Sequence, residues 1–199
     1  MQSLVLATGN VGKQRELTAL LQGRGLQLLR QGELGVSSVE ETGTTFEANA
    51  LLKARHAAAA TGLPALADDS GLEVDALGGA PGVYSARYAV EHAGDEANTA
   101  LLLQRLQGLP LSARTARFRC VIVLLRSADD DAPLLAAGRW EGHIAVAPAG
   151  EGGFGYDPVF VPRGGVLTVA ELDDTTKNQA SHRAQALQDL LARWPGSLR

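Results

Sequence analysis

The feature that most constrains the fold is an apolar run, Leu4 to Ala7, which leads directly into a polar turn and a lysine. The turn reads Thr8-Gly9-Asn10-Val11-Gly12-Lys13. In open α/β sheets, ligands collect where a buried strand ends, and the N–H groups at a helix N-terminus attract anions. The turn is neither a P-loop nor a dinucleotide fingerprint, because its glycines are too close together and no hydroxyl follows the lysine. The pattern therefore predicts a phosphate-binding turn, with an ordinary strand-to-helix connection as the alternative.

Apolar periodicity and turn residues predict alternating strands and helices along the chain. We expect strands near 3–7, 26–30, 64–68, 116–126, 133–146 and 157–161, and helices near 11–22, 45–61, 95–107 and 179–193. Segment 71–92 and the two long strands after residue 115 are typical of antiparallel additions to the sheet. This order predicts an α/β fold with an elongated mixed β-sheet flanked by helices. We expect residues 1–199 to form one domain of two lobes around a cleft, with a lobe boundary near 110–115.

Composition narrows the possible partners. The chain has 199 residues, a net charge of -4 and a pI near 5.6, which argues against a broad nucleic-acid or membrane-binding surface. No stretch approaches the roughly 20 apolar residues of a membrane span. Cys120 lies in an apolar run, where a thiol is typical of a protein core. We therefore expect a cytoplasmic protein that binds a small molecule and neither nucleic acid nor a membrane.

Lys53 stands out within the long predicted helix. At 100° per residue it shares a face with Phe46, Asn49 and Ala50. A lysine in an apolar stripe is costly unless it reaches water or meets an anion. Lys53 therefore predicts either a side chain that extends to solvent or a cation directed at a phosphate or a carboxylate. A capping-box pattern at Thr44 and Glu47 predicts the start of this helix.

Acidic pairs flank the same helix. Glu40 and Glu41 precede it, and Asp68, Asp69 and Ser70 follow the next apolar strand. Adjacent side chains on an extended backbone point to opposite sides, so we expect one member of each pair to face a common site. Carboxylates at the C-terminal end of this strand suit Mg²⁺, which binds through one or two carboxylates together with substrate phosphates. The alternative is that these acidic pairs are simply exposed to solvent. The four histidines, His56, His92, His143 and His182, lack the close spacing of a zinc site.

Two later segments carry candidate substrate-binding groups. The loop Gly152-Gly153-Phe154-Gly155-Tyr156-Asp157-Pro158 offers aromatic rings and a carboxylate that could hold a purine, or could form a plain turn. Lys177, His182 and Arg183 lie near the start of the closing helix, where positive charge opposes the helix dipole unless an anion is nearby. Tyr84, Arg87 and Tyr88 could form a subunit contact or a site wall.

Together these motifs resemble the inosine triphosphate pyrophosphatase family, and most closely its bacterial XTP/dITP diphosphatases. The resemblance covers nearly the whole chain. It rests on the following segments: Thr8-Gly9-Asn10 with Lys13, Glu40-Glu41-Thr42-Gly43, Phe46 to Ala54, Ala67-Asp68-Asp69-Ser70-Gly71-Leu72, Pro81 to Tyr88, Gly153 to Pro158, and Ser181-His182-Arg183. The one departure is Ala180, which is smaller than the family pattern and affects only local helix packing.

The resemblance implies a homodimer that hydrolyses non-standard purine nucleoside triphosphates (XTP, dITP and ITP) to the monophosphate and pyrophosphate with Mg²⁺. It makes Asp69 the general base and a metal ligand, and Glu40 or Glu41 the second ligand, with Glu40 slightly favoured. It assigns triphosphate binding to residues 8–13 with Lys53 and Ser70. It assigns base and sugar binding to the following residues: Phe154, Gly155, Tyr156, Asp157, Lys177, His182 and Arg183.

Two alternatives remain at this point. A Maf-like pyrophosphatase would act on modified or pyrimidine nucleotides, and the Ser181-His182-Arg183 motif argues against it. A non-catalytic nucleotide sensor would keep the phosphate turn and the base loop without needing Asp69 and its metal partners. The presence of those acidic residues disfavours a sensor.

Overall fold

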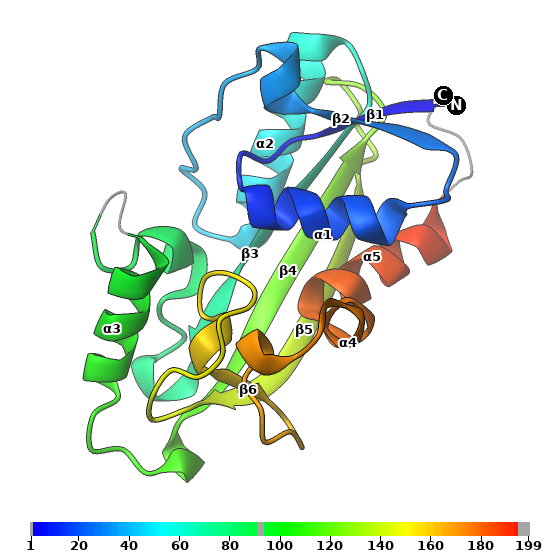
Figure 1. Ribbon diagram of the computed structural model, residues 1–199. Helices are drawn as coiled ribbons and strands as arrows, with labels where there is room; N and C mark the ends of the chain where they lie inside the picture. The colour runs from blue at the N-terminus through cyan, green and yellow to red at the C-terminus, as the bar shows by residue number, and fades with distance from the viewer. Residues whose placement is uncertain (1, 91–93, 195–199) are drawn as a thin grey trace. The chain divides into compact units, whose positions relative to one another are not determined.

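The computed structural model describes residues 2–90 and 94–194 (Figure 1). Its strands and helices, in chain order, are β1 (Gln2–Leu6), α1 (Val11–Leu21), β2 (Leu26–Arg30), α2 (Phe46–Thr61), β3 (Ala65–Val74), α3 (Asp95–Arg105), β4 (Thr115–Leu125), β5 (Leu134–Ile144), β6 (Phe160–Pro162), α4 (Asp174–Ala180) and α5 (His182–Arg193). Among the described residues, none of the helices combines the length and apolar character needed to cross a membrane.

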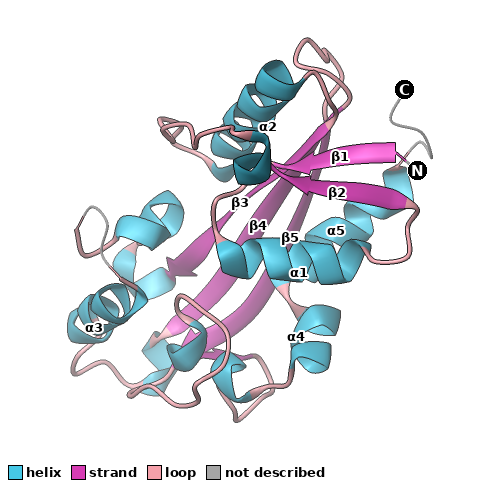
Figure 2. Cartoon of the chain, turned by 45° about the horizontal axis from the view of Figure 1, so that its top comes forward, coloured by secondary structure: helices cyan, strands magenta, loops and turns pink. Residues whose placement is uncertain are grey.

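The strands form one six-stranded sheet in the order β2-β1-β3-β4-β5-β6. β1 pairs parallel with both β2 and β3, whereas β5 and β6 are antiparallel, so the sheet is mixed. Figure 2 shows β1 and β2 as neighbouring strands with α1 running beside them. The predicted α/β class with a mixed sheet and flanking helices is thereby confirmed.

The chain divides into two compact units. Unit 1 contains the described residues up to Asp69, residues 120–138 and those from Arg183 onward, and unit 2 contains residues 70–119 and 139–182. The chain therefore crosses from one unit to the other within β3, β4 and β5 and at the start of α5. The predicted passage at 110–115 lies within unit 2, where Arg114 is buried and donates hydrogen bonds to three backbone carbonyls, those of Leu106, Ile144 and Ala145.

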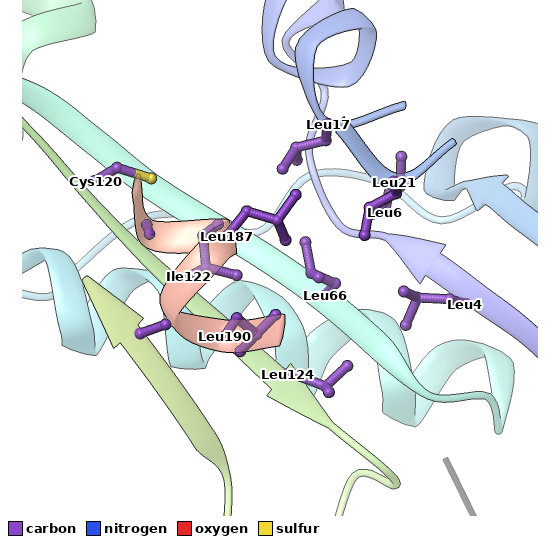
Figure 3. Close-up of a cluster of buried hydrophobic side chains, with 12 residues drawn as sticks. Leu4, Leu6, Leu17, Leu21, Leu66, Cys120, Ile122, Leu124, Leu187 and Leu190 are labelled. Carbon is purple, nitrogen blue, oxygen red and sulfur yellow. The ribbon is translucent and has the colours of Figure 1, made fainter. Parts of the chain in front are cut away.

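The core of unit 1 is aliphatic. It joins leucines of β1 and α1 to β3, β4 and α5 through a cluster that includes Leu6, Leu17, Leu66, Ile122 and Leu187 (Figure 3). Leu66 and Asp68 have the same parity on β3, so both side chains project to the face that α1 and α5 cover. The core therefore packs α1 and α5 against the first half of β3.

Unit 2 has its own core. This core includes Leu72, Leu102, Phe118 and Phe160. The rings of Phe118 and Phe160 pack with their centroids 4.5 Å apart. These core residues come from β3, α3, β4 and β6, whereas the glycine-rich loop at 152–155 contains no helix or strand of its own.

Several predicted elements differ from the structure. The prediction of antiparallel strands between the end of β3 and residue 90 is wrong, and residues 91 and 92 of the predicted segment lie outside the described residues. Gly78, Gly79 and Gly82 adopt positive φ, and the chain forms 3-10 turns with a single antiparallel bridge between Glu73 and Pro81.

Several boundaries also shift. The strand predicted at 64–68 continues to Val74, so Asp68 and Asp69 lie within β3 and not after it. Helix α2 is capped by Thr45 instead of Thr44, because the Thr45 side chain accepts from the backbone N–H of Ala48. The strand predicted at 157–161 begins only at Phe160, after a 3-10 turn that contains Pro158. The closing helix begins at His182, because extended backbone at Ser181 separates it from α4.

Candidate active site

The predicted phosphate turn joins β1 to α1 in unit 1. Asn10 is the N-cap of α1, and its Oδ1 accepts from the backbone N–H of Lys13 at 3.0 Å. The hydroxyl of the buried Thr8 accepts from the N–H of Asn10, and Gln14 donates to the Thr8 carbonyl at 2.7 Å. Gly9, Asn10 and Val11 are exposed. These contacts hold the turn in one shape at a helix N-terminus, with exposed backbone toward which an anion could approach.

Asp68 lies at the centre of a buried ion cluster at the end of this turn. Its Oδ2 is 3.3 Å from Lys13 Nζ and accepts from Arg183 Nε and Nη2 at 3.2 and 3.1 Å. Arg183 also donates from Nη1 to Glu16 Oε2. Both Asp68 and Arg183 are almost fully buried, at 0% and 1% exposed. The cluster thus joins α1, β3 and α5 by charge as well as by apolar packing.

Asp69 belongs to a second cluster, on the opposite face of β3. Lys53 Nζ donates to Asp69 Oδ1 at 2.9 Å and to Glu41 Oε1 at 2.7 Å. Asn49, one helical turn before Lys53 on α2, donates to Asp69 Oδ2 at 3.3 Å. Lys53 therefore meets carboxylates instead of extending to solvent, which explains its place on the apolar face of α2.

Glu41 and Glu40 differ in exposure and in partners. Glu41 is half-buried and forms the ion pair with Lys53, whereas the Glu40 side chain is exposed. The geometry thus favours Glu41 as the member of the pair that faces Asp69, although the sequence pattern slightly favours Glu40.

Burial and neighbouring charges shift the pKa values of Asp69, Lys53 and Asp68 in opposite directions. Burial raises the pKa of Asp69 above its usual value, an effect that the nearby Lys53 and Lys13 ammonium groups only partly offset. Burial alone would lower the pKa of Lys53, but the carboxylates of Asp69, Asp68 and Glu41 outweigh it and raise that pKa. For Asp68, desolvation is outweighed by Lys13 and Arg183, which hold its pKa well below the usual range. Asp68 is therefore a permanent anion, whereas Asp69 takes up a proton more readily.

The oxygen ligands available to a metal in unit 1 are few. Among residues 2–90 and 94–194, no group of three or more His, Cys, Asp or Glu side chains is arranged to hold an ion by itself. His92 lies outside the described residues. However, Asp69 and Glu41 already share one cationic centre, the Lys53 ammonium group. Two such carboxylates fit Mg²⁺, which completes its coordination with phosphate oxygens and water.

The aromatic loop and Lys177 meet in unit 2. Lys177 Nζ donates to Asp157 Oδ2 at 2.7 Å and lies 4.8 Å from the centroid of the Phe154 ring. Asp157 Oδ2 also accepts from the Phe154 backbone N–H at 2.9 Å. Asp157 and Lys177 are buried, whereas Phe154 and Gly155 remain half-exposed. Asp157 therefore anchors Lys177 beneath the ring of Phe154.

Gly153 is required by this arrangement. Its φ is +75°, and a Cβ at this position would lie 2.0 Å from Asp157 Oδ2. The loop is also tied down on its other side, because Gly155 N–H donates to Asp95 at 2.6 Å and the buried Tyr156 hydroxyl donates to the Ser85 carbonyl at 2.8 Å. Burial raises the pKa of Tyr156, so the hydroxyl keeps the proton that it donates.

The remaining predicted residues divide between the units. His182 is buried in unit 2 and stacks on Phe118, with centroids 4.8 Å apart and planes at 15°. Ser70 is half-buried on β3 in unit 2, whereas Arg183 belongs to unit 1. Sequence reasoning grouped Lys177, His182 and Arg183 together, and the structure instead places Arg183 with Asp68 and Glu16.

The contacts of Glu16 and Asn49 with the two ion clusters were not predicted from the sequence. Glu16 lies on α1 one turn after Lys13, so both side chains reach the same face of that helix. This spacing could have predicted that Glu16 belongs to the same cluster as Lys13. Asn49 shares the helix face of Lys53, but its sequence position alone does not reveal that it contacts Asp69.

Comparison with known proteins identifies the relatives of this chain. The sequence profile described as "Ham1 family" matches residues 4–193. The chain is 59% identical over 190 residues to a dITP/XTP pyrophosphatase of Xanthomonas oryzae pv. oryzae, covering 96% of each chain. It is 58% identical over 192 residues to the protein of that name from Escherichia coli K12, covering 96% of this chain and 97% of the relative.

Solved structures of Ham1 proteins are also similar to this chain. A HAM1 protein from Coxiella burnetii superposes with a TM-score of 0.90 at 47% identity, covering 99% of this chain and 100% of the other. The Staphylococcus aureus Ham1 protein gives a TM-score of 0.84 at 42% identity, covering 98% and 99%. The family resemblance predicted from the sequence motifs is confirmed, and the chain belongs to the Ham1 family.

Proposed function

We propose that this protein hydrolyses the non-standard purine nucleoside triphosphates XTP, dITP and ITP to the monophosphate and pyrophosphate. The observation that carries the proposal is the pair of buried clusters on opposite faces of the middle of β3, in which Asp68 meets Lys13 and Asp69 meets Lys53. Cations and carboxylates held beside a helix N-terminus suit phosphoryl chemistry. The names of the relatives, dITP/XTP pyrophosphatase, agree with this chemistry.

The triphosphate is assigned to the turn of residues 8–13. The start of α1 supplies N–H groups and the positive end of the helix dipole, and Lys13 and Lys53 supply cationic charge. Ser70 follows Asp69 on β3 and adds a hydroxyl. Each of these groups can bind a phosphate oxygen without forming a covalent intermediate, since a phosphoanhydride is already activated.

Asp69 is assigned as the general base. Its raised pKa makes its ionised form a better proton acceptor than an ordinary aspartate. Lys53 and Asn49 each hold one of its carboxylate oxygens, so its orientation is defined before substrate binds. Asp69 accepts the proton from the water that cleaves the linkage between the α and β phosphates.

Mg²⁺ is the proposed cofactor. Asp69 and Glu41 are the residues that would hold it, together with oxygens of the substrate phosphates, and the exposed Glu40 is the less favoured ligand. Bound there, Mg²⁺ would supply Lewis-acid neutralisation of the phosphate charge.

The base-binding cluster is assigned to unit 2. The half-exposed face of Phe154 can stack on a purine, and Lys177 offers a donor to an oxygen acceptor. Hypoxanthine and xanthine carry such an oxygen at the 6-position, whereas adenine carries an amino donor that a donor group would leave unpaired. Gly155, Tyr156 and Asp157 shape the loop, and His182 stacks beside it on Phe118. The ion pairs of Arg183 favour a role in holding Asp68 over direct contact with the base.

We also propose that the protein acts as a homodimer in the cytoplasm. The Tyr84 ring is 55% exposed and carries the Arg87 guanidinium 5.3 Å from its centroid. Tyrosine and arginine are enriched at subunit contacts, so this exposed pair suits one. Sedimentation equilibrium of the wild type and of Tyr84→Asp tests the assignment, with a shift toward monomer expected for the variant.

A substrate panel tests the proposed activity. The protein is incubated with XTP, dITP, ITP, ATP, GTP, CTP and UTP, with and without Mg²⁺, and both products are identified by chromatography. Monophosphate and pyrophosphate from only the first three nucleotides, and only with Mg²⁺, is the expected result. Turnover of pyrimidine nucleotides would instead indicate a Maf-like enzyme, and tight binding without any product would indicate a sensor.

A further inference from the structure

Asn49 closes a ring of hydrogen bonds around the proposed general base. Its Oδ1 accepts from the Gly43 N–H at 2.8 Å, and its Nδ2 donates to Asp69 Oδ2. Lys53 donates to Asp69 Oδ1 and to Glu41 Oε1. Because Glu41 and Gly43 lie in one loop, the ring runs from that loop through Asn49, Asp69 and Lys53 and back to the loop.

The orientation of the Asn49 amide is chemically determined. The Gly43 N–H can only donate, so the oxygen of the amide must face it, and the nitrogen must then face the Asp69 carboxylate. Asn49 is fully buried, at 0% exposed, so neither bond competes with water. An ionised aspartate, which has nearly the same size, offers acceptors only and could not supply the donor to Asp69.

The loop is fitted closely to Asn49. A Cβ at Gly43 would lie 2.6 Å from Asn49 Oδ1 and 2.8 Å from Ala48 Cβ, so only glycine lets the loop approach. The position of the loop, and with it that of Glu41, is therefore defined by the same amide that holds Asp69.

We propose that Asn49 is a positioning residue that holds Asp69 and the Glu41 loop in one geometry, so that the two carboxylates act together in nucleotide hydrolysis. This role rests on the proposed function of the site. Groups that orient metal-binding or catalytic carboxylates typically contribute about 10–100-fold to activity or metal affinity. A purely structural role would instead be to satisfy the N–H of the half-buried Gly43.

Two substitutions separate these roles. Asn49→Asp preserves size and the acceptor for Gly43 but replaces the donor to Asp69 with a second acceptor, whereas Asn49→Ala removes both bonds. We expect both variants to lower kcat for dITP by about 10–100-fold, with KM within about threefold of the wild type. Mn²⁺ binding to the nucleotide-free protein, followed by electron paramagnetic resonance, should weaken by about tenfold.

Asn98 provides the matched control. It is also buried, with Oδ1 accepting from Ala89 N–H at 2.8 Å and Nδ2 donating to the Ala86 carbonyl at 3.2 Å. Asn98→Asp and Asn98→Ala should lower the thermal unfolding temperature but leave kcat and Mn²⁺ affinity within about twofold of the wild type. Gly43→Ala, which keeps both side chains but displaces the loop, should reproduce the loss of kcat if Asn49→Asp does not fold.

The outcomes distinguish this role from the activity itself. A folded Asn49→Asp variant with wild-type kcat and Mn²⁺ affinity would overturn the positioning role while leaving the proposed function intact. A wild type that releases no pyrophosphate would overturn the proposed function. The Mn²⁺ titration alone would then test the positioning role of Asn49. Equal binding by wild type and Asn49→Asp, or none by either, would count against Asn49.

Discussion

Asp68 and Asp69 are neighbours on β3, yet their side chains contact separate sets of partners on opposite faces of the strand. Asp68 pairs with Lys13 and Arg183, whereas Asp69 pairs with Lys53. The pleat of the strand produces this division, because successive side chains alternate in direction. As a result, one carboxylate is a permanently charged structural anion and the other has a raised pKa suited to proton transfer.

Replacing Asp69 with Asn should remove most turnover. The amide cannot accept the proton from water, so we expect kcat for dITP to fall by about 10²–10⁴-fold. Binding of a non-hydrolysable dITP analogue in the absence of Mg²⁺, measured by calorimetry, should change little. Asp130→Asn is the matched control, because Asp130 is a buried carboxylate paired with Arg126 outside the site. Wild-type rates in Asp69→Asn would mean that the base is assigned to the wrong residue.

The Asp68 cluster should stabilise the fold in a pH-dependent manner. Asp68→Asn breaks a buried ion pair, which typically costs roughly 3–5 kcal/mol of unfolding free energy near pH 7. The folded-state pKa of Asp68 is lowered, so its stabilisation is complete above the ordinary value of 3.8 and is lost as the pH falls below it. Urea unfolding of both proteins from pH 7 to pH 3 should show curves that converge toward acid. A gap that widened at low pH would contradict the assignment.

Gly153 should be essential to the base-binding loop. Gly153→Ala would place Cβ against Asp157 and displace the anchor of Lys177, so we expect KM for dITP to rise by about tenfold or more. Gly164→Ala is the control, because Gly164 also has positive φ, at +80°, but has open space at the Cβ position. Steady-state kinetics on both variants separates steric displacement of Asp157 from backbone strain. Equal KM values for the two variants would argue against a role for the Asp157 anchor.

Cys120 should be inert in the folded protein. Burial raises the pKa of its thiol to about 12, so the thiolate is nearly absent at neutral pH. We expect labelling by a disulfide reagent at pH 8 to be at least about 10³-fold slower in the native protein than in guanidinium chloride. Treatment with the reagent should leave dITP hydrolysis unchanged. Rapid native labelling would show that this part of the core opens readily.

Most of the fold could be predicted from the sequence because its signals are local. The strand–turn–helix at 2–21 and the α2 helix follow from apolar periodicity and from residues that begin or end an element, such as Gly62, whose left-handed conformation ends α2. The segment after β3 was predicted wrongly, since several glycines with positive φ formed turns where strand-like residues suggested pairing. Intrinsic strand preference was weaker there than turn geometry.

The family, the α/β class and the residue types available for phosphate chemistry follow from the amino-acid sequence, since they depend on motifs and periodicity along the chain. The folded chain alone establishes which charged side chains pair. It paired Arg183 with Asp68 and Glu16, chose Glu41 over Glu40 as the partner of Lys53, and placed Asn49 against Asp69. These choices depend on which faces of α1, α2 and α5 pack on β3, and residues more than a hundred positions apart, such as Asp68 and Arg183, meet only through that packing.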